Sequence, residues 1–86
     1  MNEVLLCAAI FEQAITDYEK AKHFLRHPHG SKKQMDRDIA KARRRIADVR
    51  SFATGSYAIK YAGGSEKVVR CFGERLDEID RRYQYA

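Results

Sequence analysis

Hydrophobic positions recur every three or four residues in three long segments of the chain, which is the spacing of helices that bury one side. Residues 3–26 carry two adjacent stripes of this kind, and together they are wider than one neighbouring helix needs. The first stripe comprises Val4, Ala8, Phe11, Ile15, Tyr18 and Leu25, and the second comprises Cys7, Ile10, Ala14, Ala21 and Phe24. We expect this helix to contact two others, or one other helix and a partner subunit.

The second segment follows a break at residues 27–30, where Pro28 disfavours helix in the residue before it. Ser31 fits the N-cap of a capping box with Gln34 at the third helical position, and Gly55 ends the segment at a C′ position. The apolar residues form one narrow stripe of Met35, Ile39, Ala42, Ile46, Val49 and Ala53. The sequence therefore predicts a helix between Ser31 and Gly55.

Residues 56–62 are ambiguous because their hydrophobic residues alternate, as in a strand. A lone strand would have no pairing partner here, so we expect a short helix capped by Ser56. Gly63-Gly64 predicts a turn, and Ser65 is a suitable N-cap for a following helix. The alternating residues are Tyr57, Ile59 and Tyr61.

The last segment, residues 66–83, has the most regular helical period in the chain, carried by Val69, Phe72, Leu76, Ile79 and Tyr83. Its polar side predicts three i,i+4 ion pairs, Glu66–Arg70, Asp77–Arg81 and Glu78–Arg82. We therefore predict an all-α fold in which residues 1–86 form a single helical domain. Its architecture is a small bundle of three main helices plus one short helix.

Length and composition limit the classes of protein that fit. The chain has 86 residues, 44% hydrophobic and 34% charged, which is typical of one folded domain and not of a disordered chain. No apolar run reaches the ~20 residues of a membrane span, and the N-terminus lacks the pattern of a signal peptide. Cys7 and Cys71 belong to no C-x-x-C pair, so we expect two buried, reduced thiols in a cytoplasmic protein. A single disulfide between them is the alternative if the first and last helices pack together.

A chain this short buries a thin core and has little room for a deep catalytic cleft. We therefore expect no enzymatic activity and no cofactor, and we expect a homo-oligomer assembled through the helix of residues 3–26. Three histidines, His23, His27 and His29, lie close together in the sequence. They follow no H-E-x-x-H pattern and have no cysteine beside them, so we predict no metal site. We interpret them as the end of a helix, where a partial positive charge suits the helix dipole.

The positive charge is concentrated in the middle of the chain. The chain carries 17 Lys and Arg against 12 Asp and Glu, and residues 31–62 alone hold nine basic and three acidic residues. Such a concentration attracts an anionic partner, and aromatic rings beside it can stack on bases, although an exposed solvated helix and buried tyrosines would give the same pattern. The predicted ligand-binding residues are Lys41, Arg43, Arg44, Arg45, Arg50, Tyr57, Lys60 and Tyr61.

The opening helix and the later turns carry a family resemblance. Residues 9–18 read Ala-Ile-Phe-Glu-Gln-Ala-Ile-Thr-Asp-Tyr, and a basic stretch follows. The remaining matching positions are Phe52, Gly55-Ser56, Tyr57, Gly63-Gly64 and Val68-Val69. Over residues 8–76 the chain resembles small helical accessory proteins of phages and prophages of Gram-positive bacteria. It departs from their pattern at Ser56, Tyr57 and Gly64-Ser65, where Asp, Trp and Asp-Gly are usual.

The resemblance implies a phage or prophage protein in the cytoplasm of a bacterial host cell, and small proteins of that kind are often counter-defence factors. We therefore expect a non-enzymatic binding protein that sequesters an anionic ligand such as a nucleotide immune signal. A DNA- or RNA-binding regulator is an alternative, because the order of helices is superficially that of a helix-turn-helix. A third hypothesis is a protein inhibitor that docks its basic helix on an acidic host defence protein.

Overall fold

The computed structural model describes the backbone of residues 3–84 and the side chains of residues 9–84. Four helices account for most of this range: α1 (Glu3–Arg26), α2 (Lys32–Thr54), α3 (Ser56–Tyr61) and α4 (Glu66–Gln84). No strand occurs in residues 3–84, and the predicted all-α bundle is confirmed. The side chains of Val4, Cys7 and Ala8, which the sequence placed on the apolar face of the first helix, lie outside the described residues.

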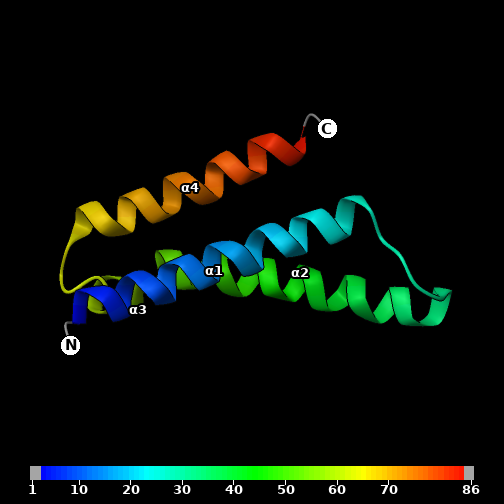
Figure 1. Ribbon diagram of the computed structural model, residues 1–86, viewed down its shortest axis with the longest axis horizontal. Helices are drawn as coiled ribbons and strands as arrows, with labels where there is room; N and C mark the ends of the chain where they lie inside the picture. Colours follow the sequence, from blue (N-terminus) through cyan, green and yellow to red (C-terminus); the bar gives the residue numbers. More distant parts are fainter. Residues whose placement is uncertain (1–2, 85–86) are drawn as a thin grey trace.

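The bundle is elongated, with extents of 44 × 26 × 21 Å. Figure 1 shows α1 and α4 running in the same direction, with α2 antiparallel to both and α3 near the N-terminal end of α1. Helix α1 contacts both α2 and α4, and α3 contacts α2 and α4. The wide apolar face of α1 is thus used within the chain to meet two helices, which was one of the two expected arrangements.

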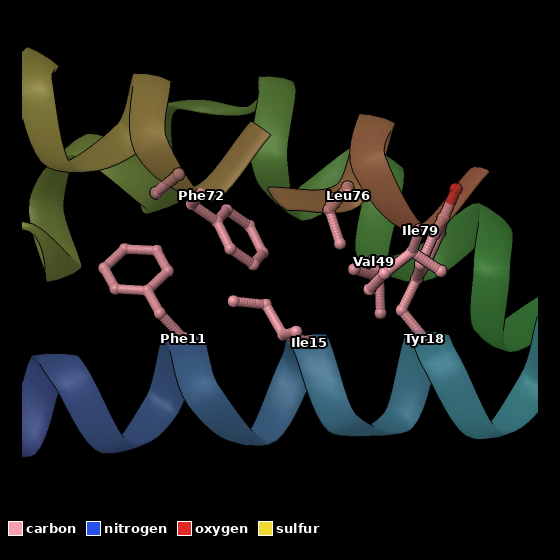
Figure 2. Close-up of a cluster of buried hydrophobic side chains, with 8 residues drawn as sticks. Phe11, Ile15, Tyr18, Val49, Phe72, Leu76 and Ile79 are labelled. Atoms are coloured by element: carbon pink, nitrogen blue, oxygen red, sulfur yellow. The ribbon is translucent and has the colours of Figure 1, made fainter. Parts of the chain in front are cut away.

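The core lies where the three long helices meet. Helix α1 contributes Phe11 and Ile15, and the ring of Phe11 lies 4.9 Å from that of Phe72 between centroids. Figure 2 shows Phe11 and Ile15 of α1 facing Phe72 and Leu76 of α4. The remaining buried members of the cluster are Tyr18, Val49, Ala58 and Ile79. The predicted stripes of α2 and α4 therefore face the core, since both supply members of this cluster.

The ends of α2 and the start of α4 follow the predicted capping residues, with one difference in mechanism at Gly55. The Ser31 hydroxyl accepts a hydrogen bond from the Gln34 amide at 3.3 Å, and Ser65 does the same for Val68 at 3.3 Å. Gly55 ends α2, but its φ of −89° is not left-handed. Glycine suits this position because a Cβ would lie 3.0 Å from the Ser51 carbonyl oxygen.

Two predictions from the sequence require correction. Ser56 is the first residue of α3 and not its cap, because Gly55 occupies the N-cap position. Cys71 is exposed and not buried, since it lies one residue before the inward-facing Phe72. Cys7 lies among the residues whose side chains are not described.

None of the described helices is both long enough and apolar enough to cross a membrane.

The ion pairs predicted within α4 are also wrong for the described residues. Asp77 binds Arg50 of α2 at 2.8 Å, and Arg82 binds Glu19 of α1 at 3.3 Å. Arg75 pairs with Glu12 of α1. A local i,i+4 pair contributes only ~0.2–0.5 kcal/mol, so it competes poorly with charges presented by a neighbouring helix. Among the described residues, the charged side chains of α4 therefore pair with α1 and α2 and not with one another.

Replacing Leu76, which is completely buried, tests the role of α4 in this core. We expect Leu76→Ala to lower the free energy of unfolding by about 2–5 kcal/mol, because it leaves a cavity among rigid neighbours. Val68→Ala on the same helix is the control, since Val68 is 42% exposed. Urea denaturation measures both variants, and equal losses would contradict the described packing of α4.

Candidate anion-binding face and aromatic groove

A line of basic residues follows the side of α2 that faces away from the core. Steps of three and four residues place them on successive turns of one helix face. All four side chains are exposed, and none forms an ion pair with another described residue. At ~1.5 Å of rise per residue they span about 16 Å. We call this set the basic stripe, and its members are Lys33, Arg37, Lys41 and Arg44.

Two predicted residues flank the basic stripe. Arg43 is exposed and forms no ion pair within the described part of the chain. Arg45 binds Asp17 of α1 at 3.2 Å, so part of its charge is neutralised. Lys41, Arg45 and Lys20 of α1 line a hollow of about 280 Å³ between the two helices. The positive face thus extends from α2 onto α1 at Lys20.

Arg50, also predicted to bind the ligand, belongs instead to a polar cluster that joins three helices. Its Nε donates to the hydroxyl of Tyr18 at 3.2 Å, and its Nη2 binds Asp77 at 2.8 Å and also Asp80. The Tyr18 hydroxyl donates to Asp80 at 2.6 Å, and Lys22 binds the same carboxylate at 2.9 Å. We call these five residues the Arg50 cluster. The carboxylates of Asp77 and Asp80 bind the guanidinium of Arg50 and neutralise its charge. Arg50 is therefore not part of the basic stripe.

The Arg50 cluster shifts the pKa values of its members. Burial, and next the hydrogen bond to Asp80, raise the pKa of Tyr18 to about 12. Burial opposes ionisation of Asp80, but hydrogen bonds from Tyr18, Lys22 and Arg50 outweigh it and lower the pKa of that carboxyl. Burial likewise opposes the charge of Arg50, but its hydrogen bonds to Asp77, Asp80 and Tyr18 raise its pKa overall. Each group therefore favours the protonation state that keeps the cluster intact at neutral pH.

The predicted aromatic residues form a separate patch on α3. Tyr57 is 66% exposed and Tyr61 is 40% exposed, so neither tyrosine is a core residue. Lys60 is exposed between them in the sequence. The ten residues that follow Arg44, up to Thr54, carry the chain about 15 Å along α2 before α3 begins. No hollow described here is lined by both an arginine of α2 and one of these tyrosines.

A second group of rings surrounds a groove of about 620 Å³ at the other end of α1. The rings of His23 and His27 lie 5.1 Å apart between centroids, and Phe24 lies 5.2 Å from His29 of the following loop. Tyr83 of α4 closes the group, 6.2 Å from His23. We call this the aromatic groove. The described residues contain no group of three or more histidine, cysteine or acidic side chains able to hold a metal ion.

The sequence contained part of the signal for this groove. The i,i+4 spacing of His23 and His27 places both on one helix face, and the backbone amide of His27 still donates to the carbonyl of His23 at 2.9 Å. No local sequence pattern places Tyr83 in this groove, because it reaches the groove only through the packing of α4. Lys33 and Arg37 extend the basic stripe beyond the residues predicted to bind a ligand.

Comparisons of the chain with known protein families, with curated proteins and with solved structures find no match. The interpretation of the site therefore depends on its own geometry and charge. These define a small helical bundle with a linear cationic face and an aromatic groove beside it.

Replacing Arg50 tests whether it acts in folding. We expect Arg50→Ala to lower the free energy of unfolding by about 2 kcal/mol, because Asp77, Asp80 and Tyr18 lose a hydrogen-bonding partner at once. Arg43→Ala removes the same side chain from the same helix without breaking a described ion pair, and it should change stability by less than ~0.5 kcal/mol. Thermal unfolding followed by circular dichroism compares the two, and equal melting temperatures would contradict the bridging role.

Alkaline titration tests the hydrogen bonds of Tyr18. The pKa of Tyr18 is higher in the folded protein, about 12, than its ordinary value of 10.0, so its contribution is complete below pH 10 and is lost as the pH rises toward 12. We expect the stability difference between the wild type and Tyr18→Phe to change across this range. Titrating groups outside the Arg50 cluster cancel in the difference. A difference that stays constant from pH 9 to about 12 would contradict this pKa.

Proposed function

We propose that this chain is a non-enzymatic protein that binds the phosphate backbone of a nucleic acid through the basic stripe of α2. The observation that carries the proposal is the line of four exposed basic side chains without ion-pair partners among the described residues. Such a face is electrostatically unfavourable unless counterions or an anionic partner neutralise it. Release of those counterions provides a driving force for binding a polyanion.

The shape of the site favours a linear anion. Successive members of the basic stripe are separated by ~4.5–6 Å along the helix, so neighbouring side chains can contact neighbouring phosphates of one strand. None of the hollows detailed above is lined by Arg43 or Arg44, and the hollow at Lys41 is small. A backbone of repeated charges can follow the exposed side of α2 without entering a pocket. This favours the nucleic-acid alternative over a compact nucleotide bound within one chain.

The nucleotide-sequestering hypothesis depends on an additional requirement. The phosphate-binding arginines and the exposed Tyr57 and Tyr61 lie on different parts of the chain, as described above. A nucleotide stacked on these two tyrosines would need a second copy of the chain to supply the rings. For that mode of binding, the expected counter-defence role therefore depends on the expected assembly through α1. The inhibitor hypothesis needs only an acidic protein surface opposite the basic stripe.

Charge-neutralising variants test the proposed function. Fluorescence anisotropy with a labelled duplex should show log K falling with log[salt] at a slope near −3.6 for about four phosphate contacts. We expect Arg37→Gln/Arg44→Gln to halve this slope and to weaken binding by roughly tenfold or more at 0.1 M salt. The reason is that two phosphate contacts are lost.

The control variant is Arg70→Gln/Arg81→Gln, which removes the same net charge from exposed positions of α4. It should bind nearly as the wild type does. Equal weakening of both double variants would show a dependence on net charge only and would contradict a site on α2. Tight binding of a small nucleotide, with no binding of any oligonucleotide, would favour the sequestering hypothesis instead.

A further inference from the structure

We infer that the bound nucleic acid is single-stranded and that its bases stack in the aromatic groove beside the basic stripe. This inference rests on the proposed function and adds the form of nucleic acid that the site accepts. It assigns a role to His23, Phe24, His27, His29 and Tyr83, none of which was predicted to bind a ligand.

The groove has the composition of a base-stacking surface. Aromatic rings bind bases of any sequence, because every base presents a flat π-face. Histidine, phenylalanine and tyrosine rings all occur here, and they come from α1, from the loop after it and from α4. The volume of about 620 Å³ lies within the ~300–1,000 Å³ range of small-molecule sites, so it is large enough for a base.

The groove and the basic stripe form one continuous surface. Lys20 lines the aromatic groove, and it also lines the hollow that contains Lys41 and Arg45. Lys41 is a member of the basic stripe. A strand whose phosphates follow α2 can therefore continue past Lys20 with its bases turned toward the rings of α1.

The charges around the groove are compatible with a strand that passes from α2 over Lys20. Glu19 is an acidic residue lining the groove, and Arg82 of α4 binds its carboxylate at 3.3 Å. Arg82 thereby offsets the repulsion that Glu19 would exert on a phosphate. Lys20 is exposed and forms no ion pair with a described residue.

A duplex cannot use the groove in this way. Its bases are paired and stacked on one another, so only the phosphate contacts of the basic stripe remain available. Bases of a single strand turn outward at little cost and can stack on aromatic side chains. The structure thus predicts a preference for single strands that depends on the rings and not on the number of phosphates.

Three ligands of equal length separate these contributions: a labelled oligothymidylate, the same backbone without bases, and a duplex. We expect the oligothymidylate to bind at least fivefold more tightly than the abasic strand, because stacking contributes a factor of ~5 to 150 per base. Phe24→Leu and His27→Ala should lower oligothymidylate affinity toward the abasic value. The salt slope should stay near that of the wild type, because the basic stripe is intact.

Tyr57→Ala is the matched control, since it removes an exposed ring from α3 at the opposite end of α1. Its oligothymidylate affinity should equal that of the wild type. Loss of affinity in this variant, with Phe24→Leu unchanged, would place the bases on α3 and overturn the inference.

The same measurements distinguish failure of the inference from failure of the proposed function. Equal binding of all three ligands, unaffected by the groove variants, would overturn base stacking but leave backbone binding by α2 intact. No binding of any ligand at low salt would overturn both. Circular dichroism of each variant shows whether a loss of affinity reflects loss of the fold.

Discussion

The guanidinium of Arg50 is the point at which the three long helices are tied together. It contacts Tyr18 of α1 and two carboxylates of α4, while its own backbone belongs to α2. Tyr18 is 1% exposed, so its hydroxyl needs partners inside the bundle, and Arg50 and Asp80 provide them. A chain of this length buries a limited apolar core. The hydrogen bonds of Arg50 have a defined geometry, which hydrophobic packing lacks, and they therefore favour one register of α4 against α1 and α2.

This arrangement separates the basic residues of α2 into two environments that composition alone cannot distinguish. Arg50 lies on the side of the helix that reaches α4, and the carboxylates there satisfy its charge. The residues of the basic stripe lie on the other side and face solvent. An excess of positive charge in residues 31–62 is therefore not distributed evenly over the helix. Arg50 pairs with α4 and Arg45 pairs with Asp17 of α1, while the rest of the outward face keeps a charge that a polyanion can neutralise.

The sequence predicted the fold well because helix period and capping are local properties. The bounds of the three long helices follow from apolar spacing together with residues such as Ser31, Pro28 and Ser65, whereas the alternating hydrophobic residues of α3 left its structure ambiguous. The site was harder to predict because it depends on which charges meet across helices. Asp77 was expected to pair with Arg81 within α4, yet it pairs with Arg50, and no local pattern reveals that choice. Tyr83 reaches its place beside His23 for the same non-local reason.

At the C-terminal end of α4, contacts that stabilise the fold also position a residue of the candidate site. Tyr83 follows Asp80 by three residues, about one helical turn, so the contacts of Asp80 with Tyr18, Lys22 and Arg50 also fix where Tyr83 lies. Arg26 strengthens this position by donating to the Tyr83 carbonyl oxygen at 3.2 Å. The groove therefore has one wall on α1 and another whose position is set by the Arg50 cluster. A substitution in the Arg50 cluster would therefore shift the ring of Tyr83 although Tyr83 itself is unchanged. The basic stripe on the far side of α2 would keep its charges. Base stacking should consequently depend on the packing of α4 more strongly than backbone binding does.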